Sequence, residues 1–174
     1  TGRTAPVAWG ANIVDEDWLV QRLNVHGVTV RQDPRPEAEI LAEALAVAAT
    51  AQVIVAAVGE AKEHAGESSS RLSPDLPAPQ QRLIAALAAT GKPLVVVVFA
   101  GRPMALGAVA QQADALLYAW HGGVAGPEGV ADLLFGAASP SGRLAVKLPA
   151  HPGEVPLSYA SDPTGRPFPG RFAK

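Results

Sequence analysis

The densest group of reactive side chains in this sequence lies between Gly59 and Arg71. This segment reads GEAKEHAGESSSR and combines three glutamates with a histidine, three serines and an arginine. It belongs to a connection of about twenty residues, and polar connections of that length are usually functional. A carboxylic acid can protonate the departing oxygen of a glycosidic bond and later deprotonate water. On chemistry alone Glu60, Glu63 and Glu67 are equal candidates for such a role, and the alternative is a solvated surface loop without function.

Other kinds of site find little support. The Gly59 segment matches neither G-x-G-x-x-G nor G-x-x-x-x-G-K-[ST], and its glutamates would repel phosphate oxygens. The sequence contains no G-x-S-x-G turn for a nucleophilic serine. His64 stands near the glutamates without H-E-x-x-H spacing, so we expect no metal site and no cofactor.

A second candidate segment is Trp120-His121-Gly122-Gly123, which follows another apolar stretch. A tryptophan face can stack on a sugar ring, and glycines let the backbone approach a ligand closely. Trp120 and His121 are therefore candidates for the rim of a binding pocket. The alternative is that Trp120 only completes a strand of the core.

The composition describes one folded domain. The chain has 174 residues, of which 48% are hydrophobic and 17% charged, so it can bury a core and disorder is not expected. A net charge of −2, spread over both signs, predicts neither nucleic acid nor a membrane surface as partner. The sequence has no cysteine, which excludes disulfides and thiolate chemistry.

Apolar runs of strand length alternate with helical patterns along the chain. The continuous Val and Ile runs are typical of strands covered on both faces. Prolines at first helical positions indicate helix starts, and acidic residues after Pro36 add to that signal. The expected strands are Ala5–Trp9, Val28–Arg31, Gln52–Val58, Leu94–Phe99, Ala115–Ala119 and Leu144–Leu148. The expected helices are a weak one over Asp15–Leu23, two that open at Pro36 and Pro79, and one over Pro127–Phe135.

This alternation predicts an α/β fold, a mostly parallel sheet of about six strands sandwiched by helices. We expect one domain over residues 1–174, with 137–174 largely loop because that part is rich in Pro, Gly and Ser. In such sheets ligands bind at the carboxyl ends of the strands. The Gly59 and Trp120 segments both follow expected strands, so both belong at that edge.

At these residues the sequence resembles the second, C-terminal α/β-sandwich domain of glycoside hydrolase family 3, and most closely the periplasmic β-glucosidase branch. Several short motifs occur in the family's order, and Gly66–Arg71 is similar to the family pattern H/G-E-x-S-S-R. The others are Asp33-Pro34-Arg35, Val58-Gly59-Glu60, Thr90-Gly91-Lys92-Pro93, Gly101-Arg102-Pro103, Ala131–Gly136, Pro140–Leu144 and Thr164–Pro167. The likeness extends over nearly all the chain from about Asp15.

The resemblance implies the acid/base-bearing domain of a retaining, exo-acting β-glycosidase that acts on the non-reducing ends of β-glucosides or short β-linked oligosaccharides. In that family a barrel domain supplies an aspartate nucleophile, and by position Glu67 corresponds to the general acid/base. The resemblance gives a supporting role to Glu60, which would orient the loop or a partner domain. It also gives one to Arg71, which would anchor the loop by pairing with a loop carboxylate or by holding the loop against the domain. The remaining loop candidates are Glu63, His64, Ser69 and Ser70.

The resemblance also carries expectations about the whole protein. We expect the chain to be part of a larger enzyme, periplasmic or secreted, and inactive without its barrel; a homodimer of the full-length enzyme is a further expectation. The family's W-x-x-G-x-E-x-G pattern has Val124 and Ala125 here at its x-E positions. Two other functions stay open: a stand-alone carbohydrate-binding or scaffolding domain, and a nucleotide-binding α/β domain.

Overall fold

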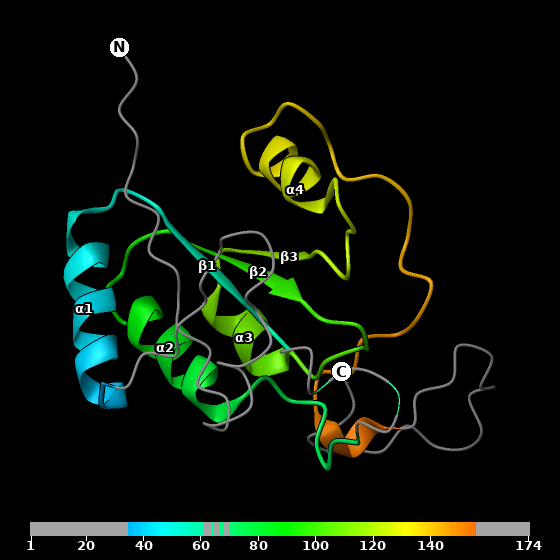
Figure 1. Ribbon diagram of the computed structural model, residues 1–174, viewed down its shortest axis with the longest axis horizontal. Coiled ribbons are helices and arrows are strands. Elements are labelled where there is room, and N and C mark those ends of the chain that lie inside the picture. The colour runs from blue at the N-terminus through cyan, green and yellow to red at the C-terminus, as the bar shows by residue number, and fades with distance from the viewer. Residues whose placement is uncertain (1–34, 61–63, 65–66, 68–69, 156–174) are drawn as a thin grey trace.

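The structure is a computed structural model that describes residues 35–60, 64, 67 and 70–155 (Figure 1). Helices and strands alternate along most of this region. The elements are α1 (Glu37–Thr50), β1 (Ile54–Gly59), α2 (Ala78–Ala88), β2 (Leu94–Phe99), α3 (Gly107–Gln112), β3 (Ala115–Tyr118), α4 (Gly126–Leu134) and the 3-10 helix η2 (Pro152–Glu154).

Within the described residues the three strands form one parallel sheet in the order β1-β2-β3. Val58 pairs with Val98, and Val98 pairs with Tyr118, so the carboxyl ends of all three strands lie at one edge. Successive parallel strands are joined by right-handed crossovers. The two connecting helices, α2 and α3, therefore lie on the same face of the sheet and contact each other.

The core lies between this face and the helices. Ile84 of α2 is fully buried, and Val96 and Val98 of the central strand are 0% exposed. Ala48 of α1 and Val109 of α3 belong to the same cluster. The core uses small and β-branched side chains, which lets the helices pack closely on the sheet.

Local sequence explains the ends of α1 and α2. Pro36 precedes α1, whose first turn contains Glu37 and Glu39 beside the positive end of the helix dipole. At the other end, Lys92 Nζ donates to the carbonyl oxygens of Ala48 and Ala51 at 2.7 and 2.6 Å. These bonds satisfy carbonyl groups that a helix end leaves unpaired.

The α/β class, the parallel sheet and its flanking helices are confirmed, and the expected positions of the three middle strands agree with β1, β2 and β3 within two residues. Helix α3 was not predicted, because its six residues, GAVAQQ, are too short to give a helical pattern. The expected elements Ala5–Trp9, Asp15–Leu23 and Val28–Arg31 lie outside the described residues.

The strand expected over Leu144–Leu148 is wrong, because this segment has no strand structure. Leu144 is 55% and Val146 40% exposed, and no ladder pairs the segment with β1, β2 or β3. The backbone just after it is hydrogen-bonded instead to the start of α3, through Leu106 N to Pro149 O and Gly107 N to Ala150 O. An apolar pattern alone does not make a strand, because tertiary packing decides which segments pair with the sheet.

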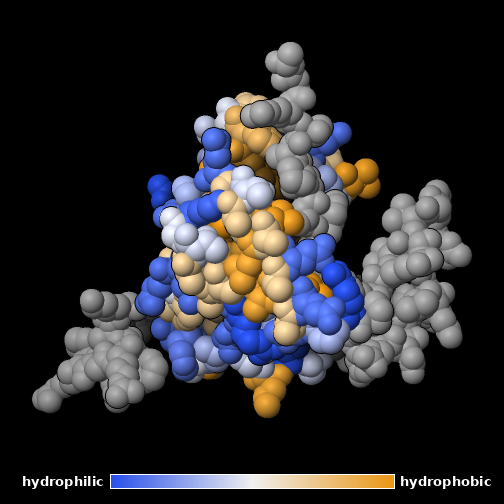
Figure 2. Space-filling model, turned by 90° about the vertical axis from the view of Figure 1, so that its left-hand side faces the viewer, coloured by the Kyte–Doolittle hydropathy of each residue, from blue (hydrophilic) through white to orange (hydrophobic). Residues whose placement is uncertain are grey.

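A band of apolar residues crosses the described surface in the view of Figure 2, with hydrophilic residues on both sides of it. Large apolar side chains are also exposed on both outer strands, among them Val55 of β1 at 51% and Leu116 of β3 at 37%. In the described part of the chain, no helix is both long enough and apolar enough to cross a bilayer.

Candidate functional site

The candidate site lies where the three strands end. β1 leads into Gly59 and Glu60, β2 into Gly101 and Arg102, and β3 into Trp120 and His121. Ligands of parallel α/β sheets bind at this edge, as expected from the sequence. The site can therefore be described strand by strand.

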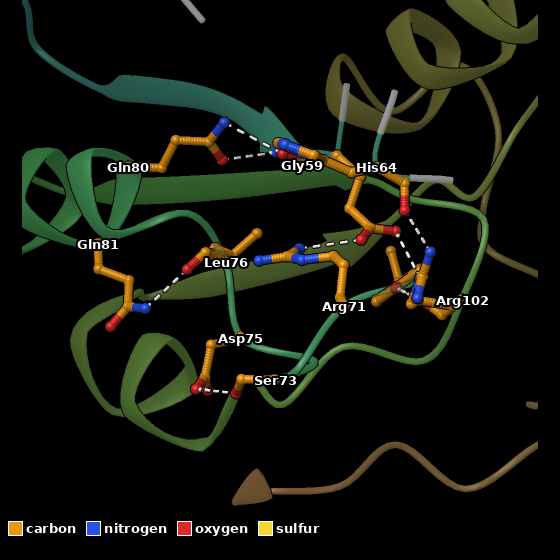
Figure 3. A network of polar contacts seen from close by, with 11 residues as sticks. Gly59, His64, Arg71, Ser73, Asp75, Leu76, Gln80, Gln81 and Arg102 are labelled. Carbon is orange, nitrogen blue, oxygen red and sulfur yellow. Dashed lines mark hydrogen bonds and ion pairs between the residues drawn. The ribbon is translucent and has the colours of Figure 1, made fainter. Parts of the chain in front are cut away.

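Gly59 is the point where β1 turns into the long connection. Its φ is 149°, and a Cβ at this position would lie 1.8 Å from the carbonyl oxygen of Phe99 on β2. Gln80 of α2 holds the same residue by two hydrogen bonds. It accepts from Gly59 N at 2.9 Å and donates to Gly59 O at 3.0 Å (Figure 3). Only glycine fits here, and the start of the loop is tied to both a strand and a helix.

Glu60 is a buried carboxylate between two arginines. Its side chain is 0% exposed, and Arg71 Nη1 donates to its Oε1 at 2.9 Å. Arg102 Nε donates to the other oxygen, Oε2, at 3.1 Å. A buried carboxylate is stable only when both oxygens are paired in this way. Arg71 thus pairs with a loop carboxylate, which is one of the two anchoring roles that the resemblance implied for it, and Glu60 joins the two ends of the loop at its base.

Arg102 also contacts the middle of the loop. Its Nη2 donates to the backbone oxygen of His64, while Tyr118 Oη donates to the backbone oxygen of Arg102 itself. Burial raises the pKa of the Tyr118 phenol to about 12, the charge of Glu60 adds to the rise, and a backbone hydrogen bond at Met104 opposes it. Dashed lines in Figure 3 mark the contacts by which Arg71 and Arg102 bind the two carboxylate oxygens of Glu60.

Within the loop, the structure separates the sequence candidates by exposure. Glu67 is exposed, whereas Glu60 is buried. His64 is half-buried, and its Nδ1 has no hydrogen-bond partner among the described residues. Ser70 is exposed. Glu63 and Ser69 lie outside the described residues. Of the two described glutamates, only Glu67 has a carboxylate open to an incoming molecule.

The second half of the connection is fixed to the domain. Ser73 Oγ donates to Asp75 Oδ2 at 2.6 Å, and Asp75 forms a parallel bridge with Ala105 beyond β2. Leu76 is only 2% exposed, and its carbonyl oxygen accepts from Gln81 Nε2 of α2 at 2.7 Å (Figure 3). The chain is therefore anchored on both sides of the exposed Glu67.

Trp120 and His121 lie beside the contacts that Glu60 makes with Arg71 and Arg102, and are not part of them. The rings of Trp120 and Tyr118 have centroids 4.4 Å apart at an interplanar angle of 46°. Trp120 has a φ of 53°, and a bulky residue in this region is strained by about 1–3 kcal/mol. His121 is exposed, and its ring lies so close to Gly101 that a Cβ there would be 2.6 Å from Nε2. Both residues of the expected rim are thus packed against groups of the site.

Sequence reasoning did not select Arg102, Tyr118 or Gln80 as site residues. Arg102 carried a usable signal, because it follows the carboxyl end of β2 by three residues, at the edge where ligands bind. Tyr118, as the last residue of β3, carried the same signal, whereas Gln80 had none, since its contacts depend on tertiary packing. Over residues 35–60, 64, 67 and 70–155, no group of three or more His, Asp or Glu side chains is placed to hold a metal ion.

The fold and the site together define the chain as a parallel α/β domain with a long, anchored, carboxylate-bearing loop at a strand end. Residues 3–172 match the family model described as the glycosyl hydrolase family 3 C-terminal domain. The chain belongs to this family. The resemblance found in its motifs is therefore confirmed.

Two relatives illustrate the match. The chain is 45% identical over 161 residues to a periplasmic β-glucosidase of Salmonella typhimurium, an alignment that covers 92% of this chain and 21% of that protein. It is 34% identical over 121 residues to a β-xylosidase of Formosa agariphila, covering 70% of this chain and 17% of that protein. The chain thus spans about a fifth of the length of these relatives.

Solved structures agree with the sequence comparison. The β-glucosidase of Listeria innocua in complex with glucose superposes with a TM-score of 0.72 at 35% identity, over 79% of this chain and 19% of that one. A β-glucosidase of Bifidobacterium adolescentis gives a TM-score of 0.65 at 33% identity, over 80% of this chain and 20% of that one. The same domain is therefore built into much larger enzymes.

Proposed function

We propose that this chain is the acid/base-bearing domain of a retaining, exo-acting β-glycosidase of the β-glucosidase kind, with Glu67 as the general acid/base. The substrates we propose are β-glucosides or short β-linked oligosaccharides cleaved from the non-reducing end. The support is that the matched relatives are named β-glucosidase and β-xylosidase, and that the matched Listeria enzyme was solved with glucose and with laminaribiose.

The observation that carries the assignment of Glu67 is the contrast with Glu60. A proton donor must reach the glycosidic oxygen, so its carboxyl group has to be accessible. Glu60 is fully buried and both of its oxygens are occupied by arginines, whereas Glu67 is exposed in a loop that is anchored on both sides. This contrast favours Glu67 over Glu60 as the residue that protonates the leaving group.

In the proposed reaction Glu67 first gives its proton to the glycosidic oxygen as a nucleophilic carboxylate attacks the anomeric carbon. It then takes a proton from the water that hydrolyses the glycosyl-enzyme. Retaining enzymes hold the two carboxyl groups about 5–5.5 Å apart. We propose that the nucleophile belongs to a barrel domain elsewhere in the parent protein, and that this chain alone is inactive. The likeness to the periplasmic relative supports our proposal that the parent enzyme is periplasmic or secreted.

The test is Glu67→Ala in the full-length enzyme encoded by the parent gene. Loss of a general acid/base lowers turnover by about 10²–10⁴-fold when the leaving group needs protonation. We expect a loss of that size for alkyl or cellobiosyl leaving groups, and a much smaller loss for a dinitrophenyl glucoside, whose leaving group departs without a proton. Added azide should restore turnover of the activated substrate and form β-glucosyl azide.

Glu63→Ala is the matched control, since it removes a second carboxylate from the same loop. If Glu63→Ala shows the leaving-group dependence and azide rescue, and Glu67→Ala does not, the assignment is wrong. The purified 174-residue chain is a separate test. Hydrolysis of an aryl β-glucoside by this chain alone would contradict the proposal that the site needs a second domain.

A further inference from the structure

We propose that Arg102 is a positioning residue for the reaction, which sets the place of Glu67 by tethering the middle of its loop. This inference rests on the proposed role of Glu67. It concerns a different residue, from the connection that follows the neighbouring strand, and it makes a separate prediction.

Arg102 extends from a firmly held backbone. Ala100 and Met104, two residues before and after it, are both 0% exposed. Its own carbonyl oxygen accepts a hydrogen bond from Tyr118 on β3. The backbone of Arg102 is therefore held by contacts of both β2 and β3. Because buried, close-packed residues resist displacement, the arginine has a fixed base that does not depend on the loop.

The side chain connects this base to two points of the loop. Nε donates to Glu60 Oε2 at 3.1 Å, at the first loop residue, and Nη2 donates to the backbone oxygen of His64. Arg71, at the far end of the loop, binds the other oxygen of Glu60 at 2.9 Å. The loop is therefore closed at its base and held again in its middle.

Glu67 lies in the span between these tethers, three residues after His64 and four before Arg71. Among the described residues, the next tether on the N-terminal side of Glu67 after His64 is at Glu60, seven residues from Glu67. A longer untethered span allows more conformations, and a displacement of about 1 Å at a reacting group can lower a rate by about 10²-fold. Among the described residues, the bond to His64 is thus the hydrogen bond nearest to Glu67 on its N-terminal side, and its loss should let Glu67 move.

The chemistry of this tether requires arginine. A guanidinium presents donors in a rigid planar arrangement and can bond a carboxylate and a carbonyl oxygen at the same time, whereas a lysine ammonium is a compact charge on a flexible stem. Arg102→Lys therefore keeps the positive charge beside Glu60 and loses the simultaneous contact with His64. Arg82→Lys is the matched control, because Arg82 is an exposed arginine paired with Glu37 on the outside of the helices.

The experiment is a double-mutant cycle in the full-length enzyme, with Arg102→Lys and Glu67→Ala singly and combined. On a substrate with a poor leaving group, we expect Arg102→Lys to lower kcat by about 10- to 100-fold with KM changed by less than about 3-fold. Arg82→Lys should change neither. When Glu67 is already alanine, adding Arg102→Lys should lower kcat by less than about 3-fold, because residues that act as one unit are not additive.

Two results would overturn the inference. One is an unchanged kcat in a folded Arg102→Lys enzyme. The other is a loss that is as large in the Glu67→Ala enzyme as in the wild type, which would mean that Arg102 acts independently of Glu67. Failure of the proposed function is a different outcome, since the single Glu67→Ala variant would then keep its turnover of poor leaving groups.

A further variant, Tyr118→Phe, covers the case in which Arg102→Lys does not fold. Tyr118→Phe removes only the hydrogen bond to the backbone of Arg102 and keeps the ring. It should produce a smaller loss of kcat that also disappears in the Glu67→Ala enzyme. A loss that persists there, or no loss at all, would count against the tether.

Discussion

Gly59 is the residue at which β1 becomes the Gly59–Arg71 loop, and replacing it with alanine tests this geometry directly. The new Cβ would lie 1.8 Å from Phe99 O, 2.6 Å from Phe99 C and 2.9 Å from Phe99 N, all of them backbone atoms of the paired strand. Backbone atoms cannot rotate away as a flexible side chain can. The ends of β1 and β2 must therefore separate, by about 1.5 Å to reach ordinary contact.

The size of the effect follows from the contacts that are lost. A non-glycine residue at a φ of 149° costs about 1–3 kcal/mol. Separating the strands also breaks the hydrogen bond from Glu60 N to Phe99 O, now 2.9 Å, and weakens the two bonds from Gln80, at about 1 kcal/mol each. We expect Gly59→Ala to lower the free energy of unfolding by about 3–5 kcal/mol, a large part of a typical total of about 5–15 kcal/mol.

Gly91 provides the matched control. It also has a positive φ, 68°, but a Cβ there meets nothing within 4 Å, so Gly91→Ala should cost only about 1–2 kcal/mol. The assay is urea unfolding of the 174-residue chain, followed by circular dichroism. If Gly59→Ala destabilises the chain no more than Gly91→Ala does, the close approach of β1 and β2 at Gly59 is not real.

Three further predictions concern the contacts around the loop. Glu60→Gln keeps the shape of a fully buried side chain and leaves two partly buried arginines without their carboxylate, so it should cost about 3–5 kcal/mol in urea unfolding, whereas Glu37→Gln, at an exposed pair, should cost far less. Gln80→Leu leaves Gly59 N and O without their side-chain partner and should cost about 2 kcal/mol; an unchanged midpoint would show that these bonds contribute nothing. The third concerns Tyr118, whose pKa is raised from 10.0 to about 12, so the native state holds this proton more tightly than the unfolded state. The resulting stability is complete below about pH 10 and is lost as the pH rises towards 12, and the difference in unfolding free energy between wild type and Tyr118→Phe should shrink over that range; a constant difference would contradict this.

Most strands and helices in the middle of the chain could be predicted, because the sequence patterns that form them involve only neighbouring residues. The Val-rich run at Leu94–Phe99 is a strand with the predicted bounds, and the acidic first turn after Pro36 begins α1. Helix α3 and the Leu144–Leu148 segment were mispredicted for related reasons. A six-residue helix is too short for a period to be recognised, and an apolar alternation becomes a strand only where tertiary packing pairs it with another strand.

The sequence by itself determined the family, the parallel α/β class and the location of the candidate site in the Gly59–Arg71 loop. Each of these depends on residues that are close together in the chain. Only the tertiary structure decided how the glutamates differ, because the buried Glu60 is paired with Arg102, 42 residues away in the sequence. It also revealed that Arg102 reaches back to His64, 38 residues earlier. Contacts between residues so far apart form only when the neighbouring strand ends of a parallel sheet come together, and a single sequence carries no local pattern that announces them.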